Sequence, residues 1–321
     1  MKARRGNRGM ALLLVLVVVA LLTSLLTDLA FSTMVDMRLT ETFRDSTRAY
    51  YLAKGGINAG RMILQEDRNK YDSLDEIWSK GVINYPVGEG SVTILIEDQD
   101  GKLAINSLVQ GNSPQAIMID RFYRFLLAME IEQQADPAEL TAALIDWIDT
   151  GDDPYTQINT DGSSLPVSGA EDIHYRSQTQ AYRCKNGPLE TLQELSLVKG
   201  FTPEIVKRIS PHLAVNETLQ VNINTASVEV LMSLDLQVSR EEAEAIIDYR
   251  QLQPIVNVAQ LEEVLAPEVY IVLKTLANLQ QLGTTSRTYR IEASALVNDG
   301  SRRLLADVDK KSNKLLFFKV N

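Results

Sequence analysis

Cysteine and histidine are scarce in this chain of 321 residues, which has one cysteine and two histidines. The single cysteine, Cys184, cannot form an internal disulfide, so another interaction must hold any long loop. Such a small stock of ligands is poor for a zinc site or a Cys–His nucleophile pair. Cys184 is best interpreted as a small core residue.

Sequence patterns of the common enzyme classes are also missing. The chain has no GxSxG, no HExxH and no phosphate-binding P-loop. Pairs of Glu and Asp abound, but acidic helices produce them by chance. A membrane-tethered glycosidase with two catalytic carboxylates is the one enzyme class left open. We therefore expect a protein that is not an enzyme.

Negative charge is concentrated in one region. The net charge is −10, with too little proline and glycine for a disordered chain. Residues 110–280 hold 25 acidic and 11 basic side chains. This excess argues against nucleic acid or anionic lipid as a partner of the region, and it leaves a cation as a candidate ligand.

An uncharged segment near the N-terminus predicts a membrane anchor. Residues 1–9 carry four basic groups and no acidic one, and Met10–Thr27 then runs for eighteen residues without a charge. A helix of that length measures about 27 Å, which is enough to span a bilayer. The basic residues should stay in the cytoplasm, so the chain after Asp28 should be translocated.

The apolar segment continues directly into a longer helical pattern. A cleavable secretory signal peptide is the alternative, but it should end in a small-x-small site and a turn. No such break occurs, no proline appears before Pro86, and apolar residues recur at helical spacing. We predict one helix from about Met10 to about Gln65, with a weak point at Gly55 and Gly56.

The basic leader that ends in Gly9, followed by this apolar helix, resembles the leader of type IV pilins and pseudopilins. The segment RAYYLAKGGINAGRMIL resembles the helix continuation of minor pilins. The resemblance implies that a prepilin peptidase of the membrane cuts between Gly9 and Met10 and that the new N-terminus is methylated. Two positions depart from the family pattern: Met10 replaces the usual Phe, and Leu14 replaces the usual Glu.

The missing glutamate favours one member of the family. A carboxylate inside a bilayer costs several kcal/mol unless it meets a cation. In pilin-like filaments that cation is taken to be the N-terminal amine of the neighbouring subunit. Leu14 therefore fits a subunit with no neighbour ahead of it, at the filament tip. The K-type minor pseudopilin of type II secretion lacks this glutamate.

The sequence predicts an α+β fold in which the long helix packs on a small antiparallel sheet. Gly90–Glu97 and Lys102–Asn106 are expected to form a hairpin across an Asp-Gly turn. Three closing strands are expected at the other end of the chain: Tyr289–Leu296, Arg302–Asp309 and Leu315–Val320.

A helical domain is predicted between the two groups of strands, and a large insertion at this place also resembles the K-type subunit. The expected division is leader 1–9, transmembrane part 10–27, helix and first hairpin 28–109, inserted domain 110–280 and closing strands 281–321. The predicted helices of the insertion are Pro114–Met129, Pro137–Asp149, Leu189–Leu197, Pro203–Ile209, Ser227–Leu234, Arg240–Arg250, Val258–Val264 and Pro267–Leu279.

An acidic loop within the insertion is the candidate metal site. Residues 146–175 hold seven carboxylates and no Lys or Arg, so they repel one another unless the loop is solvated or holds a hard cation. The strings DWID and GAED resemble those at which K-type subunits bind calcium. The resemblance implies a calcium site, with these candidate ligands: Asp149, Asp152, Asp153, Glu171 and Asp172.

Residues 221–249 support a competing function. They resemble the helix-hairpin-helix module of membrane-anchored DNA-uptake receptors, including the INTA opening. In that module a glycine-rich turn lets backbone N–H groups contact a phosphate. Here the turn from Leu234 to Ser239 has no glycine and lies among acidic residues, so a packing role is favoured over DNA binding.

The resemblance as a whole implies a structural subunit at the tip of the type II secretion pseudopilus. It would be anchored in the inner membrane by one span, with its C-terminal domain in the periplasm. The implied partners are the I-type and J-type minor pseudopilins and the prepilin peptidase, with the major pseudopilin and secreted substrates as further candidates. Nucleic acid is not an expected partner.

Overall fold

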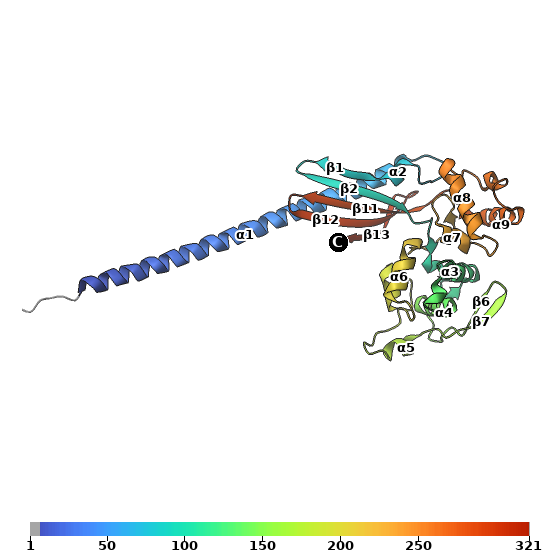
Figure 1. The fold of residues 1–321 in the computed structure, drawn as a ribbon, viewed down its shortest axis with the longest axis horizontal. Coiled ribbons are helices and arrows are strands. Elements are labelled where there is room, and N and C mark those ends of the chain that lie inside the picture. The colour runs from blue at the N-terminus through green and yellow to red at the C-terminus, as the bar shows by residue number, and fades with distance from the viewer. Residues whose placement is uncertain (1–6, 321) are drawn as a thin grey trace, which may run out of the picture.

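The computed structural model describes residues 7–320, and a single long helix dominates its shape (Figure 1). This helix, α1 (Asn7–Glu66), confirms the predicted helix of residues 10–65, and Gly55 and Gly56 do not interrupt it. Its N-terminal half projects away from the rest of the chain (Figure 1). It is long and apolar enough to cross a membrane, with an 18-residue window of mean hydropathy 2.8 that is entirely exposed. Residues 1–6 of the predicted leader lie outside the described residues.

The C-terminal third of α1 packs on a five-stranded antiparallel sheet (Figure 1). The three predicted closing strands are confirmed, each within two residues at either end. The order across the sheet is β1 (Val82–Val87), β2 (Gly90–Asp98), β11 (Thr288–Val297), β12 (Gly300–Asp309) and β13 (Lys314–Val320).

Two glycines allow α1 to approach the sheet closely. A Cβ atom on Gly56 would lie 2.9 Å from the Cβ of Ala293, and one on Gly60 would lie 2.7 Å from Cγ2 of Ile291. Ala293 and Ile291 are fully buried in β11. The helix and the strands therefore share one apolar core, which also contains Ala49, Ala53, Ile57, Leu64, Ile94, Leu304 and Ala306.

The predicted first hairpin is wrong. The strand at 90–97 exists as β2, but it pairs with β1 and β11 and not with residues 102–106. Of those residues only β3 (Leu103–Ala104) is extended, and it pairs in parallel with β8 (Leu213–Ala214). The prediction missed β1 because Pro86 and the left-handed Asn84 (φ 49°) are tolerated only at a sheet edge.

The chain leaves the sheet at Asp98 because the next residues are held by the insertion. The carboxylate of Asp98 accepts hydrogen bonds from Thr225 Oγ1 (2.5 Å) and Asn222 Nδ2 (3.1 Å) of the inserted domain, and from Ser286 Oγ (2.6 Å). Asn222 Nδ2 also donates to the carbonyl of Asp72 (3.0 Å). This buried polar junction fixes the insertion to the sheet and diverts the chain away from a tight turn.

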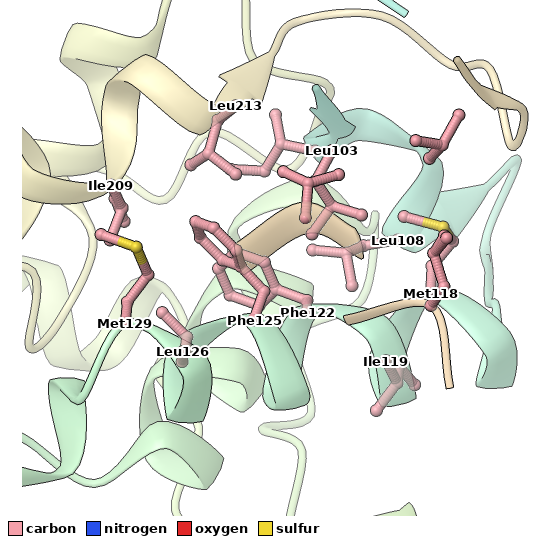
Figure 2. Close-up of a cluster of buried hydrophobic side chains, with 14 of the residues drawn as sticks. Leu103, Leu108, Met118, Ile119, Phe122, Phe125, Leu126, Met129, Ile209 and Leu213 are labelled. Atoms are coloured by element: carbon pink, nitrogen blue, oxygen red, sulfur yellow. The ribbon is translucent and has the colours of Figure 1, made fainter. Parts of the chain in front are cut away.

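The helical insertion has a core of its own. Phe122, Phe125 and Leu126 on one face of α3 point toward Ile209 and Leu213 (Figure 2). Six of the eight predicted helices are α-helices: α3 (Ala116–Ala128), α4 (Pro137–Ile148), α6 (Pro203–Ile209), α7 (Val228–Ser233), α8 (Arg240–Leu252) and α9 (Pro267–Asn278).

The other two predicted helices are short 3-10 turns, η3 (Leu192–Leu197) and η5 (Val258–Leu261), each held by a capping box at its N-terminus. The acidic segment 146–175 is not the plain loop that was expected. It contains a hairpin of β6 (Gln157–Thr160) and β7 (Ser163–Pro166), followed by the start of α5 (Asp172–Arg176). Its strands, QINT and SSLP, are mostly polar, so the sequence shows no alternation of apolar and polar residues that would have predicted a hairpin.

The junction should make the stability of the fold depend on pH. Burial, with Asp98 nearby, raises the pKa of Asp100 to about 7. The folded protein therefore keeps this proton at pH values where the unfolded chain, with an ordinary aspartate pKa of about 3.9, has lost it. Consequently the free energy of unfolding should fall as pH rises from about 4 to about 7.

Denaturant unfolding of a fragment that begins at Asp28, measured across that pH range, checks this prediction. Asp100→Asn should show a smaller fall in the free energy of unfolding with pH than the wild-type fragment. Asp299→Asn, in the exposed turn between β11 and β12, should leave the slope as it was. Equal slopes for Asp100→Asn and wild type would contradict the prediction.

Candidate functional site

Asp146 anchors the acidic segment at its start. It lies in the last turn of α4, fully buried, and accepts hydrogen bonds from the backbone N–H groups of Tyr155 (2.9 Å) and Ala170 (2.6 Å). A Cβ atom on Gly169 would lie 1.8 Å from Asp146 Oδ2, so only glycine fits there. One carboxylate thus ties the two ends of the segment to the end of α4. The sequence analysis did not name Asp146 as a functional residue. Its signal was available, because Asp146 is an acid between the apolar residues Ile145 and Trp147.

Among the predicted ligands, Glu171 is the buried one whose carboxylate lacks a hydrogen-bond partner in the described part of the chain. Its side chain is 4% exposed, and neither carboxylate oxygen has a hydrogen-bond partner among the described residues. Burial and the nearby charges of Asp146, Asp149 and Asp152 raise the pKa of Glu171 to about 8. A buried carboxylate without a partner is costly, and a cation placed beside it would remove that cost.

The other predicted ligands differ in how well they fit. The charges of Asp149 and Asp152 contribute to the raised pKa of Glu171, so these two acids lie in its neighbourhood. Asp172 is already engaged, since its carboxylate accepts from Arg176 Nε (2.6 Å) and from the backbone N–H of Cys184 (3.1 Å). Asp153 is exposed, and the geometry gives it no role. In the described part of the chain, Glu171, Asp149 and Asp152 do not form a group with oxygens within 4.8 Å of one another. Glu171, with two unpartnered oxygens, is therefore the best-supported single ligand, and Asp146 holds the chain beside it.

Aromatic packing gives this segment a rigid support. The ring of Trp147, which follows Asp146 in α4, packs edge to face on Tyr175, with ring centroids 5.1 Å apart. Tyr182 packs on both rings. Cys184 is buried beside them, as predicted, with its Sγ atom 3.4 Å from the carbonyl oxygen of Asp146.

A second group of carboxylates is already occupied by a lysine. Asp67, Asp72 and Glu76 have oxygens within 4.8 Å of one another. Lys310 Nζ lies 2.6 Å from Asp67 and 2.5 Å from Asp72, and it also faces the ring of Tyr289. The ammonium group satisfies Asp67 and Asp72, and Glu76 accepts from the backbone N–H of Ser73 and from Trp78 Nε1, so we assign no metal there.

The helix-hairpin-helix lookalike at 221–249 is used for packing. Asn222, which precedes its INTA string, and Thr225 within that string make the polar junction with the sheet. The turn between α7 and α8 buries Leu234 and Val238. Arg240, the cation beside that turn, lies within 4.0 Å of the carboxylates of Glu229 and Glu244. A phosphate at this turn would meet acidic groups and buried leucine and valine side chains.

A serine, a histidine and a glutamate meet nearby without forming a catalytic relay. Ser227 Oγ lies 2.7 Å from Nδ1 of His212, and Glu229 Oε2 lies 3.8 Å from the same nitrogen. A nucleophile relay needs the serine and the carboxylate on opposite ring nitrogens. Ser227 also caps the N-terminus of α7 by accepting from the backbone N–H of Val230.

Comparison with known proteins identifies the family. Two family models, both described as type II secretion system (T2SS) protein K, match residues 101–218 and 221–277, which together exceed half of the chain. The chain belongs to the protein K family of the type II secretion system. The resemblance to the K-type minor pseudopilin, drawn from the leader, the missing glutamate and the insertion, is confirmed.

Curated relatives of this family cover most of the chain. Type II secretion system protein K of Pseudomonas aeruginosa is 28% identical over 257 residues, which are 77% of this chain and 73% of the relative. The same protein of Aeromonas hydrophila is 24% identical over an alignment of 342 positions, which covers 99% of this chain and 98% of the relative. The family is a structural component of the secretion system and is not known for catalysis.

A solved structure confirms the fold. The crystal structure of the GspK–GspI–GspJ complex from the type 2 secretion system of enterotoxigenic Escherichia coli contains a chain that matches with a TM-score of 0.63. The match covers 90% of this chain and 99% of that chain at 17% identity. The predicted α+β architecture, with a long apolar helix, an antiparallel sheet and a helical domain, is therefore confirmed.

None of these comparisons supports the DNA-receptor alternative, and we predict no DNA binding. A fragment that begins at Asp28 should not be retained on duplex DNA at about 50 mM salt, where phosphate contacts are strong. The reason is the excess of acidic over basic side chains in residues 110–280. An electrophoretic mobility assay measures this directly, and saturable micromolar binding would contradict the prediction.

Proposed function

We propose that this chain is the tip subunit of a type II secretion pseudopilus and that it starts the filament together with I-type and J-type minor pseudopilins. The solved complex in which a chain of this fold occurs names the same three kinds of subunit. Two features of this chain favour a position at the start of the filament.

Leu14 is the first feature. It lies on the exposed apolar part of α1, where pilin-like subunits carry a glutamate that meets the N-terminal amine of a neighbour. A leucine at this depth makes no such ion pair and costs nothing to bury in lipid. The position ahead of this subunit can therefore be empty.

The position of the inserted domain is the second feature, and it carries most of the proposal. The insertion lies beyond the end of α1 that is distant from the apolar segment, where it spreads well to one side of the helix (Figure 1). Another subunit stacked in that direction would meet the insertion. The exposed N-terminal part of α1 remains available to subunits that follow from the membrane side.

The leader and the membrane topology complete the proposal. A prepilin peptidase would cut between Gly9 and Met10, and the mature N-terminus would be methylated. Both residues lie in the exposed first turns of α1, with Met10 66% exposed. The apolar part of α1 would anchor the chain in the inner membrane, and the sheet and the insertion would lie in the periplasm.

Calcium is the proposed ligand of the acidic segment. Glu171, Asp149 and Asp152 would supply carboxylate oxygens, and calcium accepts six to eight oxygen ligands in flexible geometry. When bound, the ion would neutralise repulsion among these carboxylates and cross-link a segment that has no disulfide. The unpartnered, buried oxygens of Glu171 support the proposal.

Counting pseudopili on cells tests filament initiation. In cells that overproduce the major pseudopilin, loss of this chain should lower the number of filaments per cell by about tenfold, since every 1.4 kcal/mol of lost nucleus stability changes a population tenfold. The length of the remaining filaments should not fall, because elongation does not use the tip subunit. Filaments that are as numerous but shorter would contradict initiation.

A further inference from the structure

The two edges of the sheet are built differently. At one edge, β1 contains Pro86 and a register irregularity between Val82 and Tyr85. Proline in an edge strand lacks a backbone donor and so keeps the strand from pairing with another chain. At the other edge, β13 contains no proline. Its one irregularity lies opposite Asp307 and Val308, and 317–320 continue as a regular strand.

The side chains of β13 are apolar and uncovered. Five of its seven residues are Leu, Phe or Val, and Leu316 (53%), Val320 (47%) and Phe318 (38%) remain well exposed. Alternate backbone N–H and C=O groups of an edge strand point away from its neighbour and are available for pairing. An exposed apolar edge of this kind is a template for strand addition.

Positive charge surrounds this edge, in contrast to the negative charge of the whole chain. Lys311, Lys314 and Lys319 are exposed, and across residues 7–320 none of them forms an ion pair within 4 Å. The neighbouring acids of β12 are neutralised, since Asp307 pairs with Arg290 and Asp309 with Arg287. The sheet edge therefore presents uncompensated lysines.

The lysines help to decide which partner can pair with β13: a second copy of the strand, a lipid surface or another polypeptide. Two copies of β13 paired antiparallel would bring four lysines, Lys314 and Lys319 of each copy, to one edge with no acidic residue in either strand, and uncompensated like charges are destabilising. A lipid surface is also disfavoured, because Arg61 contacts Asn313 at the start of this edge. Arg61 follows Thr27 by 34 residues, or about 50 Å of helix.

We propose that β13 is a docking edge for an acidic, extended segment of another polypeptide, which adds to the sheet as a further strand. Apolar side chains of the segment would cover the exposed Leu and Phe residues, and its carboxylates would meet Lys314 and Lys319. A cavity of about 730 Å³ between β13 and the inserted domain offers room for an anchoring side chain. Its lining combines the apolar side chains of Leu316, Phe317 and Val215 with acids that include Glu190 and Glu217, so the anchoring side chain would be an apolar one.

A peptide-binding experiment on the full chain in neutral detergent tests the proposal. The probe is a fluorescent decapeptide that alternates valine with glutamate, and micelles without protein serve as the blank. At low salt its anisotropy should show saturable binding. With a ¹³C-labelled peptide, the infrared carbonyl band should shift to that of a paired strand. No saturable binding would overturn the proposal.

Charge reversal separates this site from general attraction. Lys314→Glu combined with Lys319→Glu should weaken binding about tenfold or more, and the variant should instead bind a peptide that alternates valine with lysine. Lys80→Glu combined with Lys274→Glu makes the same charge change on exposed residues of α2 (Ile77–Lys80) and α9, and it should leave binding unchanged.

A peptide with proline at its centre tests strand pairing itself. Proline removes a backbone donor and cannot extend a ladder, so this acidic peptide should not bind. Equal binding of the proline peptide would show attraction by charge alone and would overturn the docking edge. An unchanged affinity in the Lys314→Glu, Lys319→Glu variant would do the same.

Discussion

Chelation of calcium is expected to lower the melting temperature of a fragment that begins at Asp28 by about 5–10 °C. A ligand that binds only the folded state at a hundredfold excess over its Kd adds about 2.7 kcal/mol to the free energy of unfolding. For a domain of this size each kcal/mol corresponds to about 2–4 °C. The gain arises because the ion gives the buried carboxylate of Glu171 a partner.

Glu171→Gln and Asp153→Asn form a matched pair of variants for this test. Glu171→Gln removes the buried charge and should abolish the calcium-dependent shift, whereas Asp153→Asn changes an exposed acid and should keep it. Magnesium should shift the melting temperature less, because it demands octahedral geometry and retains its water ligands. Differential scanning calorimetry of a metal-free fragment provides the measurement. The same melting temperature with calcium and with chelator would contradict the calcium site and favour a solvated acidic surface that binds no metal.

Gly60→Ala is expected to destabilise the fold by about 1–3 kcal/mol, the usual cost of an added methyl group in a well-packed core. The new Cβ atom would lie 2.7 Å from Cγ2 of Ile291, which is fully buried in the central strand of the sheet. Either α1 must move away from the sheet or Ile291 must leave its rotamer. Denaturant unfolding of the same fragment measures the loss.

Gly55→Ala is the matched control within the same helix. Nothing lies within 4 Å of a Cβ atom on Gly55, which faces solvent. Alanine should therefore raise the free energy of unfolding by up to about 1 kcal/mol through helix propensity alone. If both variants shifted stability in the same direction by the same amount, close packing of α1 on the sheet would not explain the role of Gly60.

Long, periodic elements were predictable from the sequence. The 60 residues of α1 carry an uninterrupted apolar and then amphipathic pattern, and β11 alternates between buried and less buried side chains. Proline or a capping residue marks the start of several inserted helices, including Pro137, Pro203 and Pro267. These signals lie within single elements, so they can be recognised in the sequence without knowledge of the tertiary contacts.

Features that depend on distant partners were not predictable. The string from Asp98 to Gly101 has the form of a hairpin turn. Asn222 and Ser286, more than 120 residues away, bind Asp98 and redirect the chain. In the same way, Asp172 looked equivalent to Glu171 as a ligand. Only the fold shows that Arg176 and Cys184 already satisfy Asp172 and that Glu171 has no hydrogen-bond partner among residues 7–320.

Mass spectrometry of the native N-terminus tests the central claim most directly. In cells with a working type II secretion system, the chain should begin at methylated Met10, because a pilin-like subunit must lose its basic leader before its helix can enter a filament. Gly9→Ala should slow this processing and leave the fold unchanged, since no atom of the described residues lies within 4 Å of a Cβ placed on Gly9. A mature chain that begins at Met1, or one that is cut beyond Thr27, would contradict the assignment as a filament subunit.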